Sequence, residues 1–395
     1  MKRPTVEVAD ILRAQGRRFC EQHRTWLSFQ QLKVIRAITG CRTAALGGHI
    51  DVCTGCGYEA GMSYNSCRNR HCPKCQAQAR QRWLEAREQE LLETSYFHVV
   101  FTLPHQLNDL AAKNPRVLYN LLFAASAATL REVAADPKHL GARIGFLSIL
   151  HTWGQNLRHH PHIHCVIPAG GLAPDHSHWI RPRYPFFLPV KVLSRVFRGK
   201  FLAGLRKAFR QDLLRFPGEL RQLAEEKRFA AFLRTLYRTD WVVYAKPAFG
   251  GPAQVLRYLG RYTHRVAISN HRLVAFDGEK VTFRWKDYAH GNKQRKMTLS
   301  VEEFLRRFLT HVLPRGFVRI RHFGFLANSQ RGRLVSLSQR LLGSTPAARP
   351  DGNRRSECMR LLCPRCRATM TVSRRVSAAE LWAEYNVRCS FFDTS

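Results

Sequence analysis

The stretch that decides the fold is residues 159–166, which read His-His-Pro-His-Ile-His-Cys-Val. In a strand, residues two apart point to the same face, so His162 and His164 present adjacent imidazoles while Ile163 enters the core. Such a pair can chelate a divalent cation, although four histidines in six positions could also form a solvated loop. Two histidines need further ligands, and the candidates are Gln155, His151, His160 and His264.

Strand signals lie on both sides of this stretch. Runs rich in β-branched and aromatic residues predict strands at 96–103, before Pro104, and at 144–153, 163–167 and 241–246. Asp277-Gly278 predicts a hairpin of strands 273–276 and 281–285. Helical patterns occur over 117–135 and from Pro252 past Tyr262. The sequence therefore predicts an α+β fold.

Residues 191–238 predict a basic helical insert. An apolar stripe of this kind is more often core than binding groove, and the opposite, Lys- and Arg-rich face could meet phosphates. The stripe recurs every fourth position as Phe197, Phe201, Leu205, Phe209 and Leu213.

Charge is the unusual feature of the composition. The 395 residues include 64 Lys and Arg against 28 Asp and Glu, a net charge of +36, so the expected partner is a polyanion and above all nucleic acid. The longest uncharged apolar run, 117–130, is shorter than the roughly 18 to 20 residues of a membrane span, and no membrane association is expected. Without the apolar core of a secretory signal, the chain is expected in the cytoplasm, associated with the nucleoid, with reduced cysteines.

Two Cys-x2-Cys pairs predict a zinc site. Cys53 and Cys56 are separated by fifteen residues from Cys72 and Cys75, a spacing at which four thiolates can close a tetrahedron around Zn²⁺. Four protein ligands leave no open coordination position, so the zinc is expected to be structural and its module to dock on DNA. The basic residues of this module include Arg68 and Arg70.

The exact zinc ligands stay open at the level of sequence. Cys67 or His71 could replace one ligand, or could form a second site with Cys41 or His49. The C-terminal cysteines could form a second zinc ribbon or be the remnant of one, and the sequence leaves them unassigned. They are Cys358, Cys363, Cys366 and Cys389.

Residues 252–265 predict a helix with two rows of functional side chains. Tyr258 and Tyr262 are four positions apart, so one lies above the other on the same face. Such pairs are usually core aromatics. A row of cations beside them favours a role as nucleophiles instead, because cations facing a phosphate stabilise the phenolate of an attacking tyrosine. That row is Arg257, Arg261 and Arg265.

Taken together, these residues resemble a known family. His162-Ile163-His164 is similar to the histidine-hydrophobe-histidine motif of the HUH endonuclease superfamily, and Tyr258 with Tyr262 resembles the two-tyrosine signature of its rolling-circle transposases. Further segments, in the same order and spacing, resemble the insertion-sequence ninety-one transposases. They are residues 64–75, 96–104, 151–157, 170–172 and 319–324.

The resemblance implies a domain organisation. Residues 1–95 would be a helical and zinc-binding DNA-docking module, and residues 96–330 a ferredoxin-like HUH catalytic domain with a central antiparallel sheet. The basic insert 191–238 falls inside this catalytic domain. Residues 331–395 would be a basic linker and a cysteine-containing tail.

The resemblance also implies a mechanism. Mg²⁺ or Mn²⁺ would be held by His162 and His164, with Gln155 at the position of a third ligand, and a tyrosine would attack single-stranded DNA at a transposon end. The product would be a 5′-phosphotyrosine and a free 3′-hydroxyl, formed without ATP. Two other functions stay open: a replication initiator or relaxase with the same chemistry, and a non-enzymatic zinc protein that binds DNA.

Overall fold

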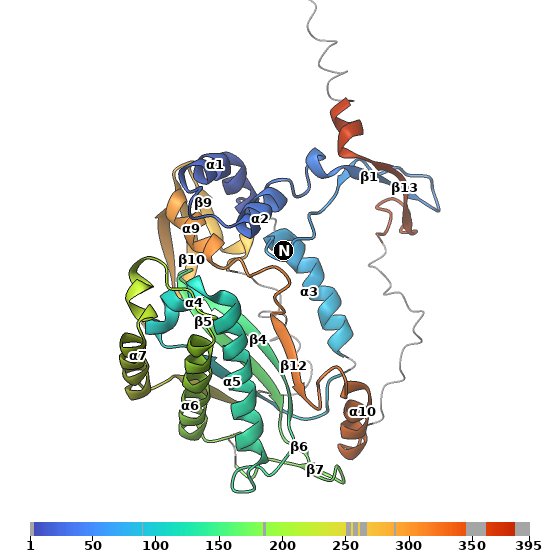
Figure 1. Cartoon of the computed structure of the whole chain (residues 1–395). Helices are drawn as coiled ribbons and strands as arrows, with labels where there is room; N and C mark the ends of the chain where they lie inside the picture. Colours follow the sequence, from blue (N-terminus) through green and yellow to red (C-terminus); the bar gives the residue numbers. More distant parts are fainter. Residues whose placement is uncertain are drawn as a thin grey trace, which may run out of the picture.

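The computed structural model describes residues 4–88, 90–184, 187–249, 254–255, 260, 267–287, 290–344 and 361–383. Helices and strands are mixed along the chain, and the sheets are antiparallel, which confirms the α+β class. Figure 1 shows the central sheet, the helices packed around it and a small strand pair that stands apart.

A five-stranded sheet forms the centre, and each strand runs antiparallel to its neighbours. The strands predicted around the histidine stretch are confirmed. The histidine run lies wholly within the middle strand, so the solvated-loop alternative is wrong. In sheet order the strands are β12 (Ile320–Gly324), β4 (Gly145–Trp153), β5 (His159–Pro168), β3 (Tyr96–Thr102) and β8 (Val243–Phe249).

Two long helices, α5 (Pro115–Ala135) and α6 (Val190–Arg210), cover one face of this sheet (Figure 1). Phe197 and Phe201 are fully buried there, which confirms that the apolar stripe of the insert is core. Leu213 departs from the prediction: it lies beyond the end of α6 and is 52% exposed. The second half of the insert forms η3 (Gly218–Ala224) and α7 (Glu226–Arg238).

The opposite face of the sheet carries a smaller apolar cluster. Leu147, Ile149 and Val166 from the sheet pack there with Val255. Trp83 and Leu84 of α3 (Pro73–Glu88) pack against the same cluster. This helix begins within the cysteine region, so the cysteine module lies directly against the central sheet.

The N-terminal helices build a second core with a segment from the far end of the sequence. Asp277-Gly278 forms the predicted hairpin turn, with Gly278 at φ +99°. This second core joins α1 (Val8–Gln22) and α2 (Phe29–Thr39) to β9 (Leu273–Phe276), β10 (Lys280–Asp287), β11 (Lys293–Ser300) and α9 (Val301–Thr310). The predicted domain boundary at residue 95 therefore divides segments that share one core.

A third, small sheet joins the cysteine module to the C-terminal tail. Its middle strand is β1 (Gly48–Cys53), which pairs with β2 (Ser63–Tyr64) on one side and with β13 (Met370–Val376) on the other. In Figure 1, β1 and β13 lie side by side, away from the central sheet.

Short elements connect these layers. The connecting elements are α4 (Asn108–Lys113), α10 (Arg331–Leu341), β6 (Gly171–Leu172), β7 (Trp179–Ile180), η1 (Ala44–Leu46), η2 (His105–Leu107) and η4 (Asn270–Arg272).

Among the described residues, no helix combines the length and the apolar character that crossing a bilayer requires.

Candidate functional site

The alternation of β5 divides its side chains between the two faces of the central sheet. Ile163 and Cys165 are fully buried in the core beneath α5 and α6. His162 and His164 therefore point to the opposite face, which carries the smaller cluster with Val166. The two imidazoles share one face, in the arrangement that a strand periodicity of two requires.

Strand pairing brings a third histidine to the same place. His151 of β4 is the register partner of His162 across the β4–β5 ladder. The ring centroids of His151 and His164 are 4.4 Å apart, and those of His162 and His164 are 4.8 Å apart. One nitrogen from each of the three rings lies within 4.8 Å of the others, so all three can converge on one cation.

A fourth histidine supports this group from β3. His98 is buried, and its Nε2 lies 2.8 Å from Nδ1 of His164. This hydrogen bond engages Nδ1, so Nε2 is the nitrogen with which His164 can bind a cation. No motif in the sequence singles out His98, although the strand pattern places it on the same face as Tyr96 and Val100.

Burial holds three rings of this group, those of His98, His162 and His164, in the neutral state. Burial lowers the pKa of His162 to about 3 and holds the pKa of His164 well below its usual value of 6.5. Burial likewise lowers the pKa of His98 to about 3. Neutral imidazoles keep the lone pair that a metal ligand needs, so the group is ready to bind a cation at neutral pH.

Gln155 lies in the turn between β4 and β5. Its backbone carbonyl accepts a hydrogen bond from the guanidinium of Arg272. Within the strands, the third nitrogen near His162 and His164 belongs to His151, which the sequence analysis named as an alternative ligand. A ligand role for Gln155 stays a prediction.

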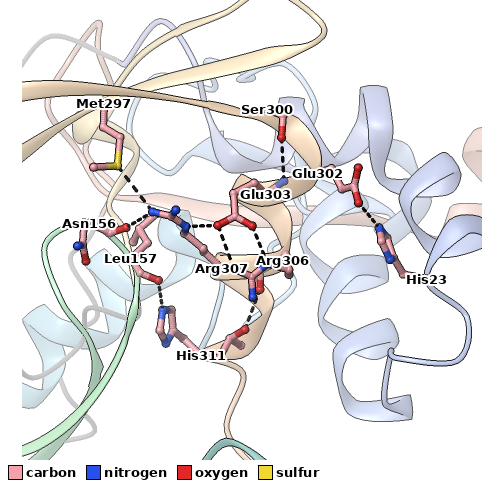
Figure 2. Close-up of polar contacts among 11 residues, drawn as sticks. His23, Asn156, Leu157, Met297, Ser300, Glu302, Glu303, Arg306, Arg307 and His311 are labelled. Carbon is pink, nitrogen blue, oxygen red and sulfur yellow. Dashed lines mark hydrogen bonds and ion pairs between the residues drawn. The ribbon is translucent and has the colours of Figure 1, made fainter. Parts of the chain in front are cut away.

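Side chains of α9 and of the residue after it hydrogen-bond to the turn that contains Gln155. Nη1 of Arg307 donates to the carbonyl of Asn156 at 2.9 Å, and Nε2 of His311 lies 3.0 Å from the carbonyl of Leu157, as Figure 2 shows. The hydroxyl of Thr152 lies 3.1 Å from Nδ1 of His311. The connection between the two histidine-bearing strands therefore has a defined geometry.

The predicted nucleophiles lie outside the described residues. These are Tyr258 and Tyr262, together with Arg257, Arg261 and Arg265. Two residues of the same stretch, Val255 and Gly260, are described. Val255 is fully buried against Leu147, Ile149 and Val166, on the face that carries the histidines. A Cβ placed on Gly260 would lie 3.0 Å from Leu84 of α3, so the chain passes close to that helix.

A basic cleft of about 540 Å³ lies between α3 and the edge strand β12. Its lining includes Arg68, Arg70, Arg319 and Trp83, and none of the described residues that line it is an Asp or a Glu. Two nitrogens of Arg70 donate to the carbonyls of Phe317 and Pro314, so this arginine also holds the wall of the cleft. Because β12 pairs with β4, the cleft adjoins the strand that carries His151.

The first cysteine centre is not the predicted one. Cys72 and Cys75 lie with Cys41 and Cys67, and Cys75 Sγ is 3.6 Å from both Cys41 Sγ and Cys67 Sγ. Cys72 Sγ is 3.7 Å from Cys41 Sγ. A ZnS₄ tetrahedron with bonds of about 2.3 Å has sulfur–sulfur edges of about 3.8 Å, so the four thiols fit Zn²⁺. His71 is not in this group: its Nε2 accepts the backbone N–H of Leu313 at 3.1 Å.

The predicted grouping of Cys53 and Cys56 with Cys72 and Cys75 is corrected by the structure. Cys53 and Cys56 lie with Cys363 and Cys366 of the tail. The knuckle spacing identified four thiols that each lie in a group of four cysteines, but spacing cannot tell which two knuckles face each other. That pairing depends on β1 meeting β13, whose partners are over three hundred residues apart in the sequence.

Two family models match the chain. The model described as "Putative transposase" matches residues 145–333, which include the three grouped histidines. The model described as "Transposase zinc-binding domain" matches residues 11–103, which include all four thiols of the first cysteine centre. A structural Zn²⁺ in this region is therefore supported by the family and by the geometry.

Two curated relatives are similar over most of the chain. "Putative transposase y4qJ" of Sinorhizobium fredii (strain NBRC 101917 / NGR234) is 56% identical over 348 residues, which are 88% of this chain and 87% of the relative. "Transposase for insertion sequence element IS801" of Pseudomonas savastanoi pv. phaseolicola is 29% identical over 296 residues, 72% of this chain and 68% of the relative. No solved structure matches. The chain therefore belongs to the transposases of the IS91 family.

Proposed function

We propose that the protein cleaves and rejoins single-stranded DNA at transposon ends, in the cytoplasm, through a 5′-phosphotyrosine intermediate. One observation carries the proposal. His151, His162 and His164 converge on the sheet face against which Val255 is buried, and Val255 lies three positions before Tyr258 in the sequence. The central antiparallel sheet, with the histidines on its middle strand, supports a ferredoxin-like HUH domain.

The donor set supports a divalent cation at this group. His151, His162 and His164 would hold it, and when bound it would withdraw charge from a scissile phosphate. Because imidazole nitrogen is a softer ligand than a carboxylate oxygen, this set favours Mn²⁺ over Mg²⁺. The hydrogen bond between Nδ1 of His164 and Nε2 of His98 would keep the ring of His164 in place.

Either tyrosine could supply the nucleophile. The phenol oxygen of Tyr258 or Tyr262 would form a bond to phosphorus as the bond from phosphorus to the 3′-oxygen breaks. The phenol loses its proton and the departing 3′-oxygen gains one. One phosphodiester replaces another, so the bond energy is kept for rejoining and no nucleotide cofactor is needed. A second tyrosine allows another strand to be cut while the first is occupied.

The basic cleft offers a path for the DNA strand. Arg68 and Arg70 line it, the described part of its lining holds no carboxylate, and Trp83 provides a surface on which a base can stack. Since the cleft adjoins β4, a strand bound there would lead toward His151. The zinc module would then help to position the DNA as well as to dock on it.

A covalent-adduct assay tests the proposal. The full-length protein is incubated with Mn²⁺ and single-stranded DNA from a transposon end, and adducts are separated on a denaturing gel. Wild type should form an adduct, and the double variant Tyr258→Phe/Tyr262→Phe should form none while still binding DNA. Tyr237→Phe, at an exposed tyrosine of α7, should behave as wild type.

The outcomes separate the alternatives. An undiminished adduct in the double variant would remove the nucleophile assignment. A wild type that forms no adduct but binds DNA would favour the non-enzymatic zinc protein. If an adduct forms but a donor plasmid with transposon ends yields no transposition, the replication initiator would be favoured.

A further inference from the structure

The loops at the two cysteine pairs outside the first centre have the same local structure. The N–H of Cys53 donates to the carbonyl five residues on, that of Tyr58, at 2.8 Å, and the N–H of Cys363 donates to that of Ala368 at 2.8 Å. The fourth residue after each first cysteine adopts a positive φ, +68° at Gly57 and +64° at Arg367. Two knuckles of one kind thus come from opposite ends of the chain.

Backbone amides in both knuckles point at the first sulfur. The N–H groups of Gly55 and Cys56 donate to Cys53 Sγ at 3.3 and 3.4 Å. In the tail, the N–H of Arg365 donates to Cys363 Sγ at 3.4 Å. Amide donors stabilise the negative charge of a thiolate, which is the form that binds metal.

Each sulfur of the N-terminal knuckle lies next to a sulfur of the tail knuckle. Cys53 Sγ lies 3.3 Å from Cys366 Sγ, and Cys56 Sγ lies 3.7 Å from Cys363 Sγ. These distances are too long for disulfides of about 2.05 Å. They are close to the edges of about 3.8 Å in a ZnS₄ tetrahedron. All four sulfurs lie within 4.8 Å of one another.

The apolar core around these sulfurs is too small to stabilise the packing of the tail by itself. Its buried apolar cluster consists of Cys53, Cys363 and Met370, and two of these are the cysteines themselves. Without β13, the strand β1 keeps the pairing of Gly48 and His49 with β2 and a single bridge from Val52 to Glu59 within its own loop. Folded units of this size generally need a metal or a disulfide to be stable.

We propose that Cys53, Cys56, Cys363 and Cys366 bind a second Zn²⁺, which clasps the tail to the N-terminal module. This tail clasp is separate from the first centre and lies partly beyond the matched family regions, which end at residue 333. It has four thiolate ligands and no open position, so its role is structural. It holds the exposed residues Arg365 and Arg367 beside the N-terminal module.

Zinc counting on the full-length protein tests the tail clasp. After removal of loose metal, wild type should carry about two zinc ions per chain. The double variants Cys363→Ser/Cys366→Ser and Cys53→Ser/Cys56→Ser should each carry about one. Cys20→Ser changes a cysteine outside both groups and should keep the wild-type zinc content.

The opposite results would overturn the proposal. If the four N-terminal knuckle cysteines formed one site, wild type would carry about one zinc and the Cys53→Ser/Cys56→Ser variant none. An unchanged zinc content in Cys363→Ser/Cys366→Ser would likewise exclude a tail site.

A second measurement uses wild type alone and does not depend on how variants fold. Cysteines are alkylated with and without a zinc chelator and then mapped by mass spectrometry. Exposed Cys366 should resist alkylation until zinc is removed, while Cys20 should react equally in both samples. Rapid alkylation of Cys366 in the zinc-loaded protein would contradict the clasp.

Discussion

At the scale of single residues, the site depends on nitrogens that stay neutral and face one another. His162 and His164 follow from the alternation of one strand, whereas His151 reaches them only through the pairing of β4 with β5. Gln155, in the turn, is the competing third ligand. His151 belongs to a strand and Gln155 to a loop. Substituting each residue in turn tests which of them is the third ligand.

We expect His151→Ala to reduce Mn²⁺-dependent adduct formation by about 100-fold or more, because it removes one of three converging nitrogens. Binding to single-stranded DNA, measured by fluorescence anisotropy, should be unchanged. His105→Ala, at an exposed histidine of η2, serves as the control. Greater loss in Gln155→Ala than in His151→Ala would reverse the ligand assignment.

Buried His311 predicts a pH dependence of stability. Burial lowers its pKa to about 3, while the unfolded chain has a histidine pKa of about 6.5. Between these values the unfolded state binds more protons, so this contribution to stability is complete above pH 6.5 and is lost as the pH falls. The loss is about 1.4 kcal/mol per pH unit, or about 2 kcal/mol at pH 5.

Urea unfolding at pH 7 and pH 5 measures this effect. His311→Gln removes the titrating ring, so its free energy of unfolding should change less between the two pH values, by about 2 kcal/mol. Equal pH dependence in the variant and in wild type would show that His311 does not stay neutral in the folded chain.

At the scale of elements, α9 fixes the turn that joins the two histidine strands. Arg307 is 11% exposed at its side chain and donates both to Glu303 and to the carbonyl of Asn156. Arg306 binds the same carboxylate but is 52% exposed at its side chain (Figure 2). The two arginines share a partner and differ in burial and in the contact to the turn.

Arg307→Ala should therefore lower the free energy of unfolding by about 1 to 3 kcal/mol, because it removes the donor to the carbonyl of Asn156 and one of the two arginines that bind Glu303. Arg306→Ala should cost less than about 1 kcal/mol, as exposed ion pairs do. Urea unfolding measures both. Equal losses would mean that the contact with Asn156 contributes nothing.

The helical insert makes a second prediction at this scale. Phe201 is fully buried between α6 and the sheet, so Phe201→Ala should lower the free energy of unfolding by about 3 to 5 kcal/mol. Leu213→Ala, at the exposed end of the same stripe, should stay within about 0.5 kcal/mol of wild type. Thermal or urea unfolding distinguishes them, and comparable losses would mean that Leu213 is also core.

At the scale of the whole molecule, the net charge of +36 sets how the protein meets DNA. Each phosphate contact releases counterions, so affinity falls with rising salt. We expect the affinity for single-stranded DNA to fall by about 300-fold or more between 50 and 200 mM salt if six or more phosphates are contacted. Anisotropy titrations over this range measure the slope. A slope near zero would contradict a binding surface dominated by charge.

Much of the fold and of the site could be predicted because the information is local. The strands around His162, the hairpin at Asp277-Gly278 and the buried stripe with Phe201 follow from periodicities of two and of about four residues. The positive charge and the Cys-x2-Cys knuckles are equally local. These features identified the residue types of the site and the expected family before any contact was known.

Contacts between distant segments could not be predicted in this way. Cys53 meets Cys366 because β1 pairs with β13, and His151 meets His162 because β4 pairs with β5 in one register. The helices α1 and α2 share their core with β9 and α9 for the same reason. A local pattern shows which way a side chain points along its own element, whereas its partners depend on how the whole chain packs. The sequence by itself determined the elements and the chemistry they carry, and the tertiary structure decided which of those groups face one another.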